Sequence, residues 1–206
     1  MVKILDDLAR LGRLAERFVE IRPELAMETL VVSSFSLEAL DGRSVSLEAH
    51  HGRRVLLAFL RNAQCAVCNL WVHTTERHAA QWREQGLDVI AVFESSAERL
   101  RDQFAEWKPS FAVLADPDGR VHDAYGSRTD PARVQQVVES GIAHEALARA
   151  NAAGFPTIRE DGSNFFRLPA EILVDEAGMI AMSHVAEDVG NHLSEATITA
   201  FARRSR

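Results

Sequence analysis

The sequence predicts an α/β protein with a central sheet, because apolar runs of strand length alternate with segments of helical pattern. Three such runs cover residues 55–60, 87–93 and 111–115, and a helical pattern separates each from the next. Parallel neighbours in a sheet need a crossover connection, and a helix is the usual one. This β-α-β-α-β order indicates parallel strands at the core. The 206 residues are ample for one domain with a full core.

Segments on either side of this core extend the sheet. Residues 32–37 and 44–47 are strand-like and flank the turn sequence Asp41-Gly42, and residues 170–175 and 179–185 form a second predicted hairpin. We therefore expect a central mixed sheet flanked by helices. The flanking helices are expected from just after residues 65–68 to about residue 85, from Ser95 or Ser96 to about residue 107, and from about residue 194 to 203.

Two further helical regions are predicted outside this framework. Apolar residues recur at three- and four-residue steps in residues 2–20, which indicates an extra N-terminal helix. We expect residues 1–30 to be a helical extension that packs on the core or serves in oligomerisation, and residues 31–206 to be the main domain. A helical insertion is expected around residues 127–160, with short helices at 131–140 and 144–151.

Composition narrows the possible partners. The formal net charge of −7 and the lack of a basic cluster argue against nucleic acid. No apolar run approaches the roughly 18 residues that a membrane span needs, and Asp6 and Asp7 in the first turns are unlike a secretory signal. Two cysteines without such a signal fit a reducing compartment. We therefore expect a cytoplasmic protein.

Both cysteines of the chain lie in one motif, Cys65-Ala66-Val67-Cys68. The motif follows the first core strand directly and precedes a helix, which is the arrangement of a thioredoxin-like redox site. There the first cysteine meets unpaired backbone N–H groups and the positive end of the helix dipole. Both favour a thiolate, and cysteines in such motifs have pKa values of about 3.5 to 7. Cys68, one helical turn later, is close enough to close a disulfide.

Two structural interpretations of the cysteines compete with this one. Free cysteines often fill space in a core. A structural zinc site would need two more ligands, and His73 and His78 lie at the wrong spacing for a Cys2His2 finger. The pairing at this spacing favours redox chemistry, with no metal and no organic cofactor.

From Phe35 to Phe201 the chain resembles the peroxiredoxin-like branch of the AhpC/TSA group, within the thioredoxin-fold superfamily. The residues that carry the resemblance occur in order along the chain: Phe59-Leu60-Arg61 before the CxxC motif, Leu114-Ala115-Asp116-Pro117, Tyr125-Gly126, Arg167-Leu168-Pro169-Ala170 and Asp175-Glu176-Ala177-Gly178.

The resemblance implies roles for five positions. Cys65 matches the attacking, peroxidatic cysteine, and Cys68 would be a resolving cysteine of the same chain. Pro169 matches a cis-proline that faces the CxxC motif, with a trans proline at a strand start as the alternative. Arg167 matches an arginine that stabilises the thiolate and polarises a peroxide, with a surface arginine as the alternative. Arg61 is a second candidate cation.

One departure from the family pattern concerns peroxide binding. Typical peroxiredoxins carry Pro-x-x-x-Thr/Ser-x-x-Cys, and here Ala58, Asn62 and Cys65 take those places. The Thr or Ser hydroxyl that would form hydrogen bonds with the thiolate and the peroxide is therefore absent. The Asn62 amide can donate a hydrogen bond in its place.

The resemblance implies a thiol-dependent oxidoreductase of cell redox homeostasis. In the first hypothesis, Cys65 reduces hydrogen peroxide or an organic hydroperoxide, Cys68 closes an intramolecular disulfide, and an external dithiol such as a thioredoxin-like protein restores the thiols. The alternative is a thiol–disulfide oxidoreductase with little antioxidant, peroxide-reducing activity. A third hypothesis is a redox-responsive binding protein whose N-terminal helix or residues 120–165 contact a partner. A homodimer is compatible with each.

Overall fold

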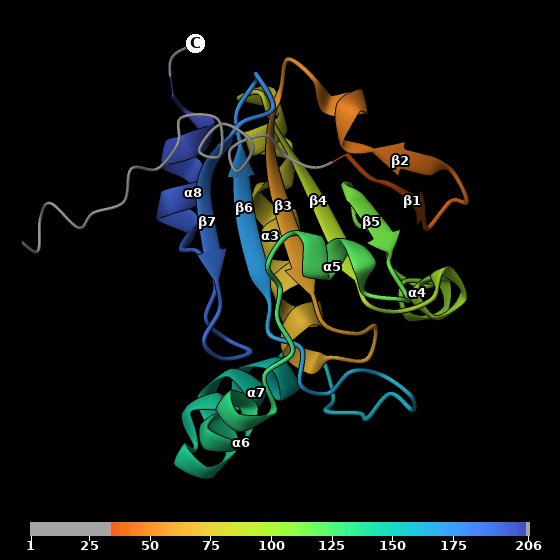
Figure 1. Cartoon of the computed structure of the whole chain (residues 1–206), viewed down its shortest axis with the longest axis vertical. Helices are drawn as coiled ribbons and strands as arrows, with labels where there is room; N and C mark the ends of the chain where they lie inside the picture. Colours follow the sequence, from red (N-terminus) through yellow and green to blue (C-terminus); the bar gives the residue numbers. More distant parts are fainter. Residues whose placement is uncertain (1–33, 205–206) are drawn as a thin grey trace, which may run out of the picture. The chain divides into compact units, whose positions relative to one another are not determined.

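The computed structural model of the chain describes residues 34–204 (Figure 1). The predicted helix at residues 2–20, the whole expected extension at 1–30 and the first three residues of the expected main domain therefore lie outside the described residues.

In the described part of the chain, the strands form one mixed sheet in the order β2-β1-β5-β4-β3-β6-β7. The three core strands β3, β4 and β5 are parallel, and every other pairing is antiparallel. This confirms the predicted fold class. The strands are β1 (Ser36–Ala39), β2 (Ser44–Ser46), β3 (Arg54–Leu60), β4 (Leu87–Phe93), β5 (Ala112–Ala115), β6 (Ala170–Val174) and β7 (Ile180–Val185).

The helices follow the predicted order with two additions. They are η1, a 3-10 turn (Leu47–His50), α3 (Ala66–Glu84), α4 (Ala97–Gln103), α5 (Arg120–Ala124), α6 (Pro131–Ser140), α7 (Ile142–Ala152) and α8 (Glu195–Ala202). The sequence did not predict η1 or α5, and α4 ends about four residues before the expected end. Ser96 is the N-cap of α4, since its side chain accepts a hydrogen bond from the backbone N–H of Arg99.

The core strand β3 is buried on both sides, which explains its continuous apolar sequence. Leu56 and Ala58 face a cluster that includes side chains of α3 and α8. Leu57 and Phe59 face the opposite cluster, which contains Tyr125 at the end of α5. Figure 1 shows α3 and α5 on these opposite faces of the sheet. No helix in the described residues is long and apolar enough to cross a membrane.

The end of β3 is fixed by a buried histidine of α5. His122 is fully buried, and its Nε2 lies 2.8 Å from the carbonyl oxygen of Leu60. Its Nδ1 lies 2.7 Å from Oδ2 of Asp116, which also accepts hydrogen bonds from the backbone N–H groups of Val121 and His122. These contacts tie α5 and the end of β5 to the point where β3 runs into the CxxC loop.

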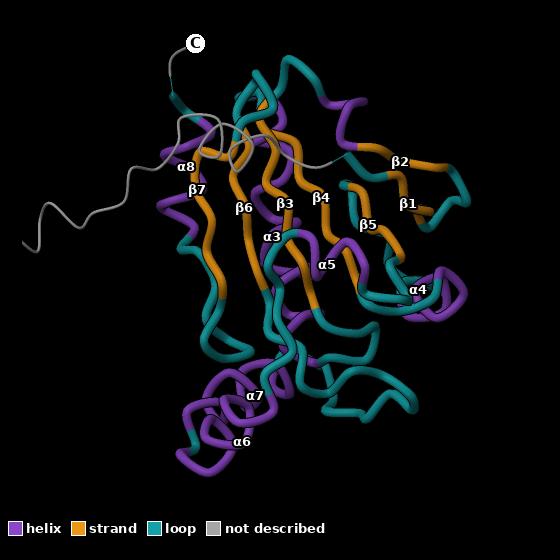
Figure 2. The backbone as a smooth tube through the Cα atoms, in the orientation of Figure 1, coloured by secondary structure: helices purple, strands orange, loops and turns teal. Residues whose placement is uncertain are grey.

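The predicted helical insertion is the pair α6 and α7. Gly141 joins them with a φ of 73°, a left-handed conformation that glycine adopts without strain. Figures 1 and 2 show the pair beyond the end of the sheet, joined to it by loops and close to the start of α3. The insertion therefore lies beside the CxxC motif.

Candidate active site

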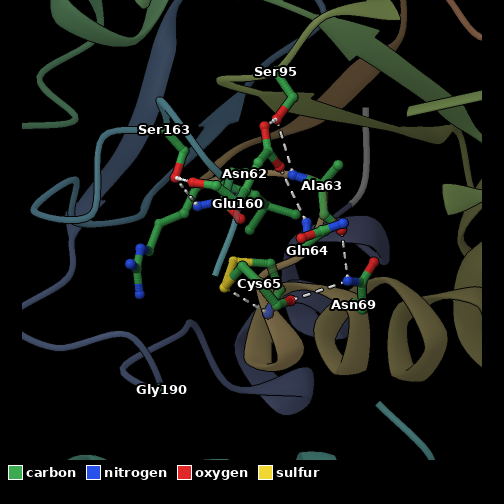
Figure 3. The surroundings of a disulfide bond; sticks show 12 residues. Asn62, Ala63, Gln64, Cys65, Asn69, Ser95, Glu160, Ser163 and Gly190 are labelled. Atoms are coloured by element: carbon green, nitrogen blue, oxygen red, sulfur yellow. Dashed lines mark hydrogen bonds between the residues drawn. A yellow bond between two sulfur atoms is a disulfide. The ribbon is translucent and has the colours of Figure 1, made fainter. Parts of the chain in front are cut away.

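The two cysteines form a disulfide at the first turn of α3 (Figure 3). Cys65 is the N-cap of the helix in an extended conformation, and its Sγ accepts a hydrogen bond from the backbone N–H of Cys68 at 3.3 Å. The Cα atoms are 5.2 Å apart, within the usual range for a disulfide. The bond is therefore compatible with an intact helix start.

The two sulfurs differ in access. Cys65 keeps 8% of its surface exposed and lines a cavity, whereas Cys68, in the first turn of α3, is completely buried. An incoming thiolate can therefore reach Cys65 and not Cys68. Of the two cysteines, Cys65 is therefore the one that faces the cavity.

Reduction of the disulfide leaves the Cys65 sulfur at the helix N-terminus. The N–H group of Cys68 already points at this sulfur, and the positive end of the α3 dipole lies at the same place. Both interactions are stronger with an anion than with a thiol, so they favour the Cys65 thiolate.

A buried carboxylate, Glu160, holds the loop that precedes Cys65 (Figure 3). Its Oε2 accepts a hydrogen bond from the backbone N–H of Gln64, and its Oε1 accepts one from the Ser95 hydroxyl at 2.8 Å. Ser95 in turn accepts a hydrogen bond from the backbone N–H of Ala63 at 3.0 Å. Arg99 pairs with the same carboxylate at 2.8 Å. The carboxylate thus satisfies loop N–H groups that would otherwise be buried without partners.

Sequence reasoning did not identify Glu160. It lies in a loop without periodicity, next to the turn sequence Asp161-Gly162, and its partner Gln64 is 96 residues earlier. No local pattern marks such a contact.

The cavity beside Cys65 has a volume of about 420 Å³. Its wall comes from the start of α3, from α6 and α7, and from residues 157–168. Most of the lining side chains are apolar, namely Ala66, Val67, Val134, Val137, Val138, Ala143, Leu147, Ile158, Phe165, Phe166, Leu168 and Val189. Cys65 thus lines a mostly apolar space.

Of the two predicted cations, Arg61 and Arg167, only Arg61 lines this cavity. Its guanidinium donates to the carbonyl oxygen of Phe165 at 2.7 Å and lies 5.0 Å from the centre of that residue's ring. Its buried Nε has no hydrogen-bond partner among the described residues. Burial lowers the pKa of Arg61 to about 10, although the charge of Glu94 opposes this shift. An incompletely paired cation therefore lines the same space as Cys65.

Arg167 has a different environment from the one that the resemblance implies. Its guanidinium donates to Glu94 at 2.6 Å, to Asp123 at 2.6 Å and to the carbonyl oxygen of Ser127 at 2.6 Å. Burial by itself would lower the pKa of Arg167, but these carboxylates raise it overall. The residue is 3% exposed, so the surface alternative is wrong. The structure does not bring Arg167 into the cavity, and its donors serve an internal ion-pair cluster.

Asn62 lies beside Cys65 but directs its amide elsewhere. Its Nδ2 donates to the Ser163 hydroxyl at 3.1 Å, and its Oδ1 is buried without a partner among the described residues. Its backbone oxygen accepts a hydrogen bond from the N–H of Cys65. Asn62 therefore lines the cavity and holds the loop. Its side-chain amide donates its hydrogen bond to Ser163 and not to the Cys65 sulfur.

Pro169 stands directly before β6, as predicted, but its peptide bond is trans. None of the peptide bonds in residues 34–204 is cis, so the cis prediction is wrong. The proline is buried, and its carbonyl oxygen accepts a hydrogen bond from Ala186 at 2.9 Å. Because Ala170 pairs with Phe59, Pro169 lies at the end of the sheet where β3 runs into the site. It does not line the cavity.

Metal ligation has no support in the described residues, because no group of three His, Cys, Asp or Glu side chains is arranged to hold an ion. His73 and His78 instead pack against aromatic rings, those of Trp107 and Trp82 respectively.

Solved structures with this fold include both peroxide-reducing and thioredoxin proteins. Peroxidoxin BcpB from Mycobacterium tuberculosis is 14% identical, with 85% of this chain and 96% of that chain covered and a TM-score of 0.61. The thiol peroxidase from Chromobacterium violaceum is 18% identical, with 82% of each chain covered and a TM-score of 0.57. The pneumococcal exposed lipoprotein thioredoxin Etrx1 from Streptococcus pneumoniae is 17% identical, with 83% and 98% covered and a TM-score of 0.53.

These structural similarities establish the thioredoxin-like fold, and the match to a family model establishes the family. No curated protein matches the chain. The model of the AhpC/TSA family matches residues 31–183, about three quarters of the sequence. The matched segment contains both cysteines, Arg61 and Pro169. The chain belongs to the AhpC/TSA family.

Proposed function

We propose that this protein is a thiol–disulfide oxidoreductase that cycles between the Cys65–Cys68 disulfide and the dithiol. The observation that carries the proposal is the disulfide itself, formed within the first turn of α3 between one accessible and one buried sulfur. Such a pair can open and close without unfolding of the helix.

The exchange proceeds through a mixed disulfide. The Cys65 thiolate attacks one sulfur of a substrate disulfide, forms a new S–S bond and releases the first substrate thiolate. Cys68 then loses its proton and attacks the Cys65 sulfur, which releases the second thiolate and closes the Cys65–Cys68 bond. Two electrons pass to the substrate. An external dithiol, such as a thioredoxin-like protein, returns them by the reverse sequence.

Two features favour disulfide exchange over peroxide reduction. Peroxide cleavage benefits from fixed hydrogen-bond donors aimed at the developing oxyanion. Asn62 replaces the hydroxyl residue that would supply one such donor, and its side-chain amide donates to Ser163 instead. The second expected donor, Arg167, serves Glu94 and Asp123. Disulfide exchange requires neither donor, since the leaving group is a thiolate.

Peroxide reduction is a second candidate, supported by Arg61 in the cavity beside Cys65. In that reaction the thiolate takes one oxygen from the hydroperoxide, becomes a sulfenic acid and releases an alcohol or water. Cys68 then condenses with it, water leaves, and an external dithiol reduces the disulfide. A reducing compartment such as the cytoplasm would supply the dithiol in either case.

The test compares the two substrates with the same protein. Reduced wild-type protein is assayed for reduction of insulin disulfides, and by stopped flow for oxidation by hydrogen peroxide and by an alkyl hydroperoxide. We expect insulin reduction well above the rate with dithiothreitol alone, and loss of that excess in both Cys65→Ser and Cys68→Ser.

Fast peroxide oxidation without insulin reduction would contradict the proposal and establish the second candidate. Reactivity with neither substrate would instead favour the third hypothesis, a redox-responsive binding protein.

A further inference from the structure

Exposed large apolar side chains concentrate around the cavity that contains Cys65. Of the six in the described residues, four line this cavity: Val138, Ile158, Phe165 and Phe166. A fifth, Ile142, lies on the same α6–α7 pair outside the lining. Apolar residues exposed as a group at one place commonly mark a binding site. Here four members of the group line the same cavity as Cys65.

The interior of the cavity continues this apolar surface. Val134 and Val137 of α6, Leu147 of α7 and Leu168 before β6 contribute to its wall. The volume of about 420 Å³ falls within the range of small-molecule sites. Strands β3, β4 and β6 are almost entirely buried, and none of their residues lines the cavity. The cavity is therefore a space that folding leaves open.

We propose that the cavity binds a small thiol or disulfide whose sulfur is carried on a hydrocarbon chain, with the chain against α6 and residues 157–166. This inference rests on the proposed function and names its substrate class. The sulfur of the ligand would meet Cys65 at one end of the cavity, and the apolar chain would cover Val138 and Ile158 at the rim.

Access to Cys65 favours a small ligand over a folded protein. Only 8% of the residue is exposed, and it lies in the wall of a cavity and not on an open face. A sulfur on a flexible chain can enter this space, whereas a disulfide on a folded surface must first be lifted out of that surface.

The experiment compares two small dithiols that reduce the Cys65–Cys68 disulfide by the same chemistry. Dihydrolipoamide carries a hydrocarbon chain beyond its dithiol. Dithiothreitol has two hydroxyl groups on the carbons between its thiols and no further chain. Each gives two electrons and two protons to the protein disulfide and closes to its own cyclic disulfide. Rates are measured by trapping protein thiols and are divided by the thiolate fraction of each reagent.

We expect wild-type protein to react faster with dihydrolipoamide than with dithiothreitol. Val138→Ser and Ile158→Ser should each reduce this preference roughly threefold to tenfold, which corresponds to the loss of one apolar contact. Ile142→Ser is the matched control, because it removes an equally exposed apolar side chain from the same helix pair outside the cavity. All three positions are exposed, so the variants should fold.

The outcomes separate the inference from the proposed function. Equal rates for both dithiols, or the same loss in Ile142→Ser, would refute the apolar site while leaving disulfide exchange in place. Loss of insulin reduction in Val138→Ser without a change toward dihydrolipoamide would assign the cavity to polypeptides and also refute the inference. A disulfide that neither dithiol reduces would refute both proposals.

Discussion

At the scale of single residues, two arginines near the site, the half-buried Arg61 and the buried Arg167, have different surroundings and should have different roles. Arg61 lines the cavity with its Nε unpaired among the described residues. Arg167 is paired with two carboxylates outside the cavity lining. A cation influences a thiolate most strongly when no nearer anion neutralises it. We therefore propose that Arg61 influences Cys65 and that Arg167 has a structural role.

Substitution of Arg61 should change the acidity of Cys65. We expect Arg61→Gln to raise the pKa of the Cys65 thiol by about one unit, because a nearby positive charge favours the thiolate. Arg61→Lys should retain most of the effect. The measurement is the pH dependence of iodoacetamide alkylation in a Cys68→Ser background, where an unchanged pKa in Arg61→Gln would remove Arg61 from the site.

Substitution of Arg167 should change stability and not acidity. Removal of one partner from a buried ion pair typically costs about 3–5 kcal/mol of unfolding free energy, so Arg167→Gln should be strongly destabilised in urea. The Cys65 thiol pKa should stay at the wild-type value in the folded protein. Arg167→Lys, which keeps the charge, provides a second variant if Arg167→Gln does not fold. A thiol pKa that is raised in folded Arg167→Gln and restored in Arg167→Lys would return Arg167 to the catalytic role.

The two cysteines should differ in reactivity once reduced. Cys65 lies at the helix N-cap and opens into the cavity, whereas Cys68 is fully buried. We expect the variant that retains only Cys65 to be alkylated at least tenfold faster below pH 7 than the variant that retains only Cys68, since thiolate character and access act in the same direction. Faster alkylation of Cys68 would reverse the assigned roles.

At the scale of elements, the short helix α5 positions the site through the Asp116–His122 pair. Burial alone would raise the pKa of Asp116, but hydrogen bonds from the ring and backbone of His122 and its charge lower it below 3.8 overall. A carboxyl group whose pKa is lowered by folding stabilises the protein above its unfolded-state pKa, and this contribution disappears as the pH falls through the folded-state value. The pair should therefore weaken only in acid.

Substitution of Asp116 tests this element. At pH 7 we expect Asp116→Asn to reduce the unfolding free energy by about 3 kcal/mol, because it breaks a buried pair. The difference from wild type should persist down to about pH 5 and shrink below pH 4. Asp118→Asn is the control in the same turn; with its side chain 67% exposed, it should stay within about 0.5 kcal/mol of wild type. A difference independent of pH would refute the electrostatic account of Asp116.

The elements also show which parts of this structure a sequence can predict. The core strands and α3 follow from local periodicity, and the CxxC motif follows from adjacent residues. In contrast, α5 has only five residues and no repeating pattern. The contacts of Glu160 with Gln64, and of Arg167 with Glu94, join residues 96 and 73 positions apart. Such pairings depend on how the chain folds back on itself. The resemblance of Arg167 to a family position therefore did not reveal that its partners are Glu94 and Asp123.

At the scale of the whole molecule, the account depends on a single chain that holds two electrons in the Cys65–Cys68 dithiol and gives them up when the disulfide closes. Each chain contains one reactive sulfur and one internal partner for it. Oxidation should therefore consume both thiols together and leave the protein without a covalent link to a second copy. Every other proposal about the cavity and the arginines presupposes this behaviour.

The most direct test is a redox titration of the wild-type protein in buffers of reduced and oxidised dithiothreitol. Free thiols are alkylated at each potential and counted by mass spectrometry, and covalent dimers are sought by non-reducing electrophoresis. The account predicts one two-electron transition in which Cys65 and Cys68 lose their labels together, in a monomeric product. Independent titration of the two thiols, or a dominant Cys65–Cys65 dimer, would contradict it.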